Sequence, residues 1–398
     1  MSPDGPDDDA TPDPFQGVPL FGDLAGMFAQ QGAMGWDAAR QFAVVVATGG
    51  TSEPNVDPLE RITLEQLARV AELHIGQATG LDVPSGPAGA IEPVTRATWA
   101  TRTLDAHRPY FELLAASLTP DDADSPDSPD PDDPMGFMAP LLRMAGPMLL
   151  SMSAGSMVGH LAQRCFGQYD LPLPRPAGSG IMLLPANLDR FGDEWSLPSD
   201  DVRLWVCLHE TAWHTVLAVP HVHARYDGLL RRWLASFSPD GADLGERLAG
   251  LDPSQLSDPT DLPEALSDPE VLLGAIRSPE QEAIQPELEA LVSVLVGYVD
   301  HVMDGVGGTL VTSWGMLSEA LRRHRVTAGP ADRLVERLFG LELGPSHVER
   351  GRRFVEGVVE RAGEDGLARL WVAEDHLPTP AEVDAPGLWL ARLDLSDG

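Results

Sequence analysis

The stretch Asp201–Asp227, DVRLWVCLHETAWHTVLAVPHVHARYD, places four histidines and a glutamate in an otherwise apolar run of helical character. Within it, His209–Glu210 opens the pattern H-E-x-x-H. In that pattern two histidines one helical turn apart hold zinc, and the glutamate activates a water molecule. The pattern then fails, because Trp213 stands at the second histidine position and His214 follows one residue later.

The spacing of the two histidines decides whether they can share a metal ion. Residues advance by about 100° on a regular α-helix, so side chains four apart lie on one face. His209 and His214 are five apart and point about 140° apart, so a straight helix does not bring them to one tetrahedral ion. A π-bulge between them would restore the geometry.

Two other histidine sets remain open. Glu210 and His214 are four residues apart, and His221 falls on the same stripe, although Pro220 ends or kinks the helix. His221 and His223 form a second set that could act as a local chelate. A further ligand for any set would come from the downstream helix, which offers Asp300, His301 and Asp304; Asp300 and Asp304 share a face.

A purely structural reading of the same residues is also open. His209 can be a core histidine stacked on an indole, and Glu210 with His214 can be an intrahelical ion pair. A buried Glu210 without metal needs a partner, so we expect Arg203 or His214 to neutralise it. The segment Gly167–Asp170, GQYD, reads as a helix-ending turn that could help line a pocket.

Composition excludes several partners. The 398 residues carry a formal net charge of −34, and phosphate recognition needs a positive field. We therefore expect neither a nucleic acid nor an anionic membrane as partner. Two cysteines form no disulfide framework, and the acidic amino terminus does not resemble a signal peptide, so a cytoplasmic location is predicted. Met144–Gln163 is too polar for a membrane span and predicts a buried pair of helices.

The remaining pattern predicts a predominantly α-helical protein. Residues 1–14 are expected to be disordered, and 15–398 to form a single multihelical domain with at most a few short strands, one at 180–185. Acidic, proline-rich loops are expected at about 119–134 and 238–284. The expected helices are about 20–46, 63–79, 94–118, the run from Ser199 or Asp200, 226–233, one opened by Pro286, 317–325, 331–339 and 346–362. The tail from Leu370 is expected to be extended.

Stretches along nearly the whole chain resemble the zincin-like hydrolases known mainly from G+C-rich Gram-positive bacteria. They are PFQGVPLFGDLAGMF (14–28), GWDAARQFAVVVA (35–47), LARVAELHIGQATGL (67–81), VTRATWATRTLDAHRP (94–109), FGQYDLPLP (166–174), LPANLDRFGDEW (184–195), RLWVCLHE (203–210), VDHVMD (299–304), LFGLELGPSHVERGRRFVEGVVERAG (338–363) and HLPTPAEVDAPGLWLARL (376–393). Members of that family are described as zinc-dependent metalloproteases, and some relatives as associated with deazaflavin-cofactor biosynthesis.

The resemblance implies a zincin-like bundle and a ligand pattern that this chain meets only in part. His209 and Glu210 match the first two motif positions, and His214 matches an additional histidine common in the family. Trp213 replaces the second ligand. An acidic residue often precedes the glycine of the downstream helix, where this chain has Val296.

Two functions therefore stand open. The first is a zinc-dependent metallopeptidase-like hydrolase of a peptide or small molecule. In it His209, His214, Asp300 and Asp304 supply the metal ligands, and Glu210 is the general base on zinc-bound water. The second is a catalytically inactive zincin-like protein that serves as a binding or scaffold module. Trp213 favours the second function, and the intact His209–Glu210 pair favours the first.

Overall fold

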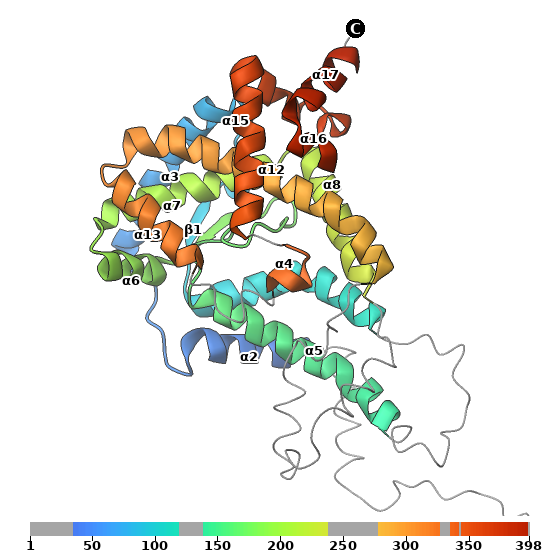
Figure 1. Cartoon of the computed structure of the whole chain (residues 1–398). Coiled ribbons are helices and arrows are strands. Elements are labelled where there is room, and N and C mark those ends of the chain that lie inside the picture. Colours follow the sequence, from blue (N-terminus) through green and yellow to red (C-terminus); the bar gives the residue numbers. More distant parts are fainter. Residues whose placement is uncertain (1–34, 119–137, 238–277, 327–334, 342–343, 397–398) are drawn as a thin grey trace, which may run out of the picture.

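The computed structural model describes residues 35–118, 138–237, 278–326, 335–341 and 344–396, and its architecture is predominantly α-helical, as predicted (Figure 1). The helices are α2 (Trp36–Thr48), α3 (Pro58–Thr79), α4 (Arg96–Ser117), α5 (Met138–Ala162), α6 (Pro185–Trp195), α7 (Ser199–Leu217), α8 (Pro220–Ala235), α12 (Pro279–Leu310), α13 (Trp314–Val326), α15 (Pro345–Ala368), α16 (Pro380–Asp384) and α17 (Pro386–Ser396).

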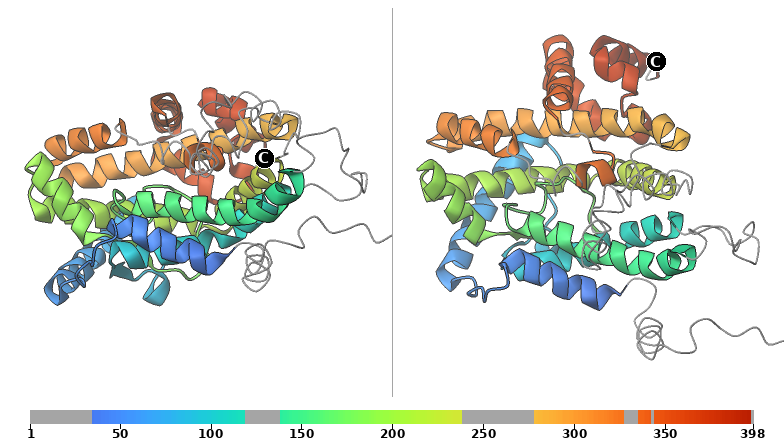
Figure 2. Two further views of the ribbon diagram at one scale, coloured as in Figure 1. Left: turned by 90° about the horizontal axis from the view of Figure 1, so that it is seen from below. Right: turned by 60° about the horizontal axis from the view of Figure 1, so that its bottom comes forward.

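The helices are stacked in layers, and α7 lies in the middle of the stack. In the right panel of Figure 2, α15–α17 form one outer layer, followed by α12, then α7 and α8, then α4 and α5, with α2 on the opposite side. This position explains the apolar character of α7, since every residue from Trp205 to Leu217 is buried. The α7 helix therefore belongs to the protein core.

Two three-residue strands form the sheet structure of the described residues. β1 (Ile91–Pro93) and β2 (Ile181–Leu183) pair in parallel, with Ile91 opposite Ile181. The strand expected at 180–185 is thus confirmed. Its partner β1 was not predicted, because three residues ending in proline give no alternating pattern.

Several helix starts differ from the sequence prediction. α3 begins at Pro58 and not at Thr63; the side chain of Asp57 caps it by accepting the Leu59 N–H at 2.8 Å. α12 begins at Pro279 and not at Pro286, because Ser278 and Gln281 form a capping box. The loop expected at about 238–284 is therefore wrong from Pro279 onward, and its residues 238–277 lie outside the described residues. At the start of α7 the capping position is held by Pro198, without a side-chain hydrogen bond.

Two further predictions named the wrong type of secondary structure. The Met-rich stretch was expected to be a helix pair, but its helical part belongs to the single helix α5. The tail was expected to be extended, but it contains α16 and α17. The end predicted near Ala362 does coincide with a break, because Gly363 interrupts α15 with a φ of 68° and a ψ of −171°. The expectations for 1–14 and 119–134, and for 20–34, lie outside the described residues.

The helix with the most membrane-like composition is α12, which is long and apolar enough to cross a bilayer. Of its most apolar 18-residue stretch, 72% is buried inside the protein. Packing of α15 on one side and of α7 and α8 on the other accounts for that burial. The apolar composition of α12 therefore has an explanation in the protein core.

Candidate functional site

A cavity of about 150 Å³ opens beside the His-Glu stretch of α7. From α7 it receives Trp205, His209 and Trp213, and from α12 it receives Val296 and Asp300. The remaining walls come from Leu161, Arg164, Cys165, Phe166, Tyr169, Asp170, Leu171, Pro172, Leu321, His324, Val335, Glu336 and Val348. Positions 209, 213 and 296, the ligand positions implied by the family resemblance, thus all face one cavity.

His209 presents its ring to this cavity from the buried face of α7. The imidazole is stacked on Trp205, with ring centres 4.8 Å apart and planes 24° apart. Its Nδ1 lies 3.5 Å from Oε1 of Glu210. A histidine stacked on an indole was the structural expectation, and Trp205 supplies the indole because it precedes His209 by one helical turn.

Glu210 is fully buried and is held by backbone amides. The N–H groups of Gln168 and Tyr169 donate to Oε2 at 2.7 and 2.9 Å, and the Tyr169 N–H also lies 3.2 Å from Oε1. Such close approach requires Gly167, since a Cβ there would lie 2.4 Å from Cδ of Glu210. Burial raises the pKa of Glu210 to about 8, although the two backbone hydrogen bonds act in the opposite direction.

The expected charged partners of Glu210 are engaged elsewhere. Arg203 donates to Glu60 at 2.6 Å and to Asp189 at 2.7 Å, on the part of α7 that leaves the core.

The neighbouring carboxyl group of Asp170 binds the same turn, because it accepts the N–H groups of Phe166 and Gly167 at 2.7 and 2.9 Å. Four successive amides, 166–169, are thus bound by the carboxyl groups of Glu210 and Asp170. Burial raises the pKa of Asp170 to about 6, and the nearby Glu210 acts in the same direction.

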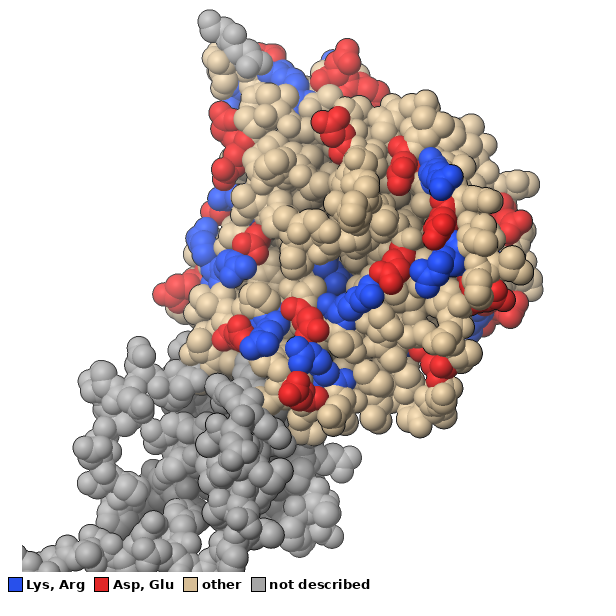
Figure 3. All heavy atoms as spheres, turned by 180° about the vertical axis from the view of Figure 1, so that it is seen from behind, with Lys and Arg blue, Asp and Glu red and all other residues tan. Residues whose placement is uncertain are grey.

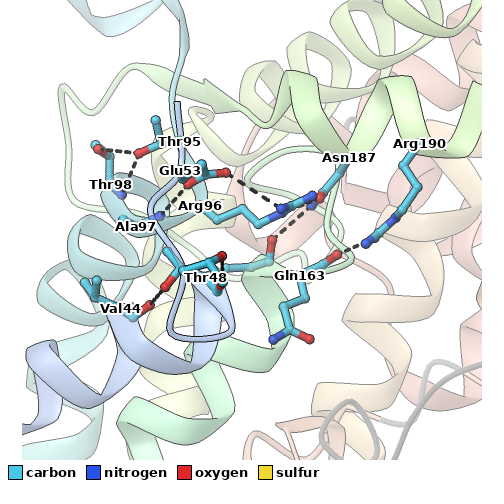
Figure 4. A network of polar contacts seen from close by, with 12 residues as sticks. Val44, Thr48, Glu53, Thr95, Arg96, Ala97, Thr98, Gln163, Asn187 and Arg190 are labelled. Atoms are coloured by element: carbon cyan, nitrogen blue, oxygen red, sulfur yellow. Dashed lines mark hydrogen bonds and ion pairs between the residues drawn. The ribbon is translucent and has the colours of Figure 1, made fainter. Parts of the chain in front are cut away.

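The turn that supplies these amides is fixed by a polar network at the end of α5 (Figure 4). Asn187 of α6 donates to the carbonyl oxygens of Ala162 and Cys165 at 3.0 and 2.6 Å, and it accepts from Arg96 of α4 at 2.8 Å. The indole N–H of Trp99 donates to the carbonyl of Gly167 at 3.0 Å. Residues from α4 and α6 therefore position the loop that receives Glu210.

His214 points away from the cavity and uses both ring nitrogens in other contacts. Its Nε2 donates to the carbonyl oxygen of Ala88 at 2.7 Å. Since that nitrogen carries the proton in the neutral ring, Nδ1 accepts from the hydroxyl of Tyr169, also at 2.7 Å. Burial lowers the pKa of His214, which favours this neutral form. Through the 209–214 interval α7 remains an α-helix, so the π-bulge is not observed.

The other predicted ligands are spread over different environments. Asp300 lines the cavity with His209, whereas Asp304 is exposed. His301 lies 3.1 Å from Glu364 on the surface. The Nε2 atoms of His221 and His223 contact different carbonyl groups, those of Leu370 at 3.4 Å and Arg175 at 3.0 Å.

Sequence reasoning missed several polar residues of the cavity. Arg164, His324 and Glu336 line it, and they come from three separate segments of the chain. The GQYD turn was weighed as a pocket wall, and Tyr169 and Asp170 do take that place. No local pattern marked the other three residues, because only the packing of separate segments brings them together.

A second, much smaller cavity of about 10 Å³ lies behind the same wall and shares Leu161, Leu171 and Val335 with the first. Three of its lining residues carry buried polar atoms without a hydrogen-bond partner among the described residues: Nε2 of His107, Nε2 of Gln168 and Nε of Arg175.

The donor set does not fit the zinc site that the family pattern implies. Trp213 and Val296 carry no ligating atom, and both nitrogens of His214 are hydrogen-bonded away from the cavity. Glu210 binds backbone amides. Across the described ranges, no group of three His, Cys, Asp or Glu side chains is placed to hold a metal ion.

Comparison with known proteins gives two matches. The profile of a family described as zincin-like metallopeptidases matches residues 34–390. A protein from Chloroflexus aurantiacus, whose crystal structure is described as that of "a putative hydrolase with a novel fold", superposes with a TM-score of 0.61 at 25% sequence identity. That similarity covers 91% of this chain and 99% of the other. No curated protein matches.

Proposed function

We propose that this chain, which belongs to the zincin-like metallopeptidase family, keeps the family's fold as a binding module and does not perform zinc-dependent hydrolysis. The observation that carries the proposal is the convergence of positions 209, 213 and 296 on one cavity. A histidine, a tryptophan and a valine occupy these positions, so a single nitrogen ligand remains where a catalytic zinc typically takes three protein ligands.

The cavity itself suggests the ligand class. A cavity of about 150 Å³ accommodates a benzene-sized molecule when its walls are apolar. Trp205, Trp213 and Phe166 supply aromatic walls, and His209 and Asp300 supply polar atoms. A single-ring compound with one polar substituent matches this lining.

Zinc content tests the loss of the metal site. We expect purified protein without a His tag to hold well under 0.2 zinc per chain, a threshold set at roughly a fifth of the one ion that a catalytic site binds. The double variant Trp213→His and Val296→Glu should approach one zinc per chain, because it restores two ligands that face His209. Adding His209→Ala to that variant should remove the metal again. Near-stoichiometric zinc in the wild type, lost on His209→Ala alone, would sink the proposal.

Fluorobenzene tests the binding role, with its ¹⁹F resonance as the readout. We expect the resonance to broaden in the presence of wild-type protein. Val296→Trp, which fills the cavity from α12, should abolish the broadening, while Gly305→Ala on an open part of α12 should preserve it. Equal broadening with wild type and Val296→Trp would show that the probe binds elsewhere.

The zinc-dependent hydrolase remains as a second candidate because His209, Asp300 and His324 face the same cavity. In that function His209 and Asp300 would be the proposed ligands and Glu210 the proposed base, whereas His214 and Asp304, the other expected ligands, do not line the cavity. The cytoplasmic location, a peptide or small-molecule substrate, and the lack of nucleic-acid and membrane partners all stay predictions.

A further inference from the structure

Helix α3 exposes a row of large apolar side chains on the face opposite its core contacts. Leu59, Ile62, Val70 and Leu73 are 72%, 51%, 37% and 57% exposed. The opposite face buries Leu64, Ala68, Ala71 and Ile75 against the rest of the protein. Figure 2 shows α3 at the margin of the helical body, where this outer face is accessible.

The exposed row is symmetric about Gln66. Its four members stand seven and four residues before Gln66 and four and seven residues after it. At about 100° per residue they fall in a stripe roughly 80° wide that is centred on the exposed side chain of Gln66. Such a pattern is self-complementary, because a two-fold axis through Gln66 places apolar residues opposite apolar residues.

The charged flank of the stripe has the same property. Arg69 and Glu65 flank one edge of the stripe, and neither side chain has a hydrogen-bond or ion-pair partner within the described part of the chain. Other helices pair equivalent residues along their own surface, as Arg108 does with Glu112 in α4. Glu65 and Arg69 are therefore available to a partner.

We propose that α3 binds α3 of a second copy of this chain as an antiparallel pair with its two-fold axis at Gln66. Leu59 then packs on the partner's Leu73, and Ile62 on the partner's Val70. Arg69 lies within one turn of the partner's Glu65. Each contact occurs twice, as in any isologous interface.

Disulfide trapping tests the register of this pair. Gln66→Cys places two thiols at the two-fold axis, whereas Gln77→Cys lies on the same stripe with its two copies about 33 Å apart. The native Cys165 and Cys207 are buried and do not compete. Under mild oxidation at about 150 mM salt, where charges beyond about 8 Å are screened, we expect Gln66→Cys to give a reducible dimer as its main product. Gln77→Cys should remain at least tenfold less cross-linked.

Sedimentation velocity tests the same interface without cysteine. Wild-type protein should dimerise as its concentration rises, Ile62→Glu should abolish this, and Glu65→Arg should weaken it at least tenfold. Combining Glu65→Arg with Arg69→Glu should restore the dimer, because the exchanged charges meet again across the axis. Circular dichroism confirms that each variant is folded. A monomeric wild type, equal cross-linking of both cysteine variants, or no rescue of the dimer by the double charge exchange would overturn the proposal. The wild type would be monomeric if another segment or protein covered the stripe.

Discussion

Glu210 and the turn 166–170 show how a motif residue can take a different role. The carboxyl group sits in the space left by Gly167 and accepts two backbone amides, while His209 stacks on Trp205. A buried carboxyl group is costly unless it is hydrogen-bonded, and the turn meets that requirement without a metal ion. The His-Glu pair is therefore accommodated by contacts that its sequence does not reveal.

Glu210→Gln should reduce the pH dependence of stability. The pKa values of about 8 for Glu210 and about 6 for Asp170 exceed the ordinary values of 4.5 and 3.8. Between about pH 4 and pH 8 the folded protein therefore retains protons that the unfolded chain releases. The stability that these two carboxyl groups contribute is complete below about pH 4 and is lost as the pH rises to about 8. Glutamine does not ionise, and its carbonyl oxygen can accept both amides. We expect the loss between pH 5 and pH 8 to shrink by about 2–4 kcal/mol in urea unfolding.

The exposed Glu360 provides a control for this measurement. Glu360→Gln removes one carboxylate from the surface of α15 and should leave the pH dependence unchanged. An identical loss of stability in Glu210→Gln and wild type would show that the Glu210 carboxyl group is ionised in the folded protein at neutral pH.

At the scale of elements, the crossing of α12 and α15 depends on two glycines. A Cβ on Gly297 would lie 2.3 Å from the carbonyl carbon of Gly351, and one on Gly351 would lie 1.8 Å from the carbonyl oxygen of Ser293. The two backbones are therefore in direct contact one residue after Val296, which faces the cavity. This close approach sets the position of the α12 wall.

Gly351→Ala should consequently push α15 away from α12. Overpacking at such a contact costs about 1–3 kcal/mol, and we expect a value near the upper end because the nearest atoms belong to the Ser293 backbone, which cannot rotate away. Gly305→Ala, on the same α12 helix with open space around it, should be neutral or stabilise the protein by up to about 1 kcal/mol. Urea unfolding of both variants measures the difference; equal stability would contradict a tight helix crossing.

At the scale of the whole molecule, the layers bring distant segments to one cavity. The turn at 166–170, α7 and α12 meet there, and the polar network of Figure 4 anchors the turn to α4 and α6. The face drawn in Figure 3 is less acidic than the net charge of the chain suggests. Arginine and acidic side chains are interleaved on it. The segments 1–34 and 119–137 contain acidic residues and no basic ones, so part of the negative charge lies outside the described residues. The proposed α3 pair also concerns the whole molecule, because it forms between the surfaces of two folded chains.

The helical class, the family and most helix positions could be predicted from the amino-acid sequence, because apolar periodicity and capping are local properties. The sequence also located β2, and it indicated that Trp213 and Val296 disturb the expected ligand pattern. It misplaced the starts of α3 and α12, where an upstream capping residue and proline extended each helix.

The contacts of the site residues could not be predicted in this way and became visible in the folded chain. The tertiary structure placed positions 209, 213 and 296 on one cavity, directed His214 to Ala88 and Tyr169, and gave Glu210 the amides of a turn about forty residues earlier. The physical reason is that hydrogen-bond satisfaction of a buried side chain depends on groups from other segments, whose approach is set by helix packing. Helical periodicity describes which face a residue occupies, and packing alone determines what that face meets.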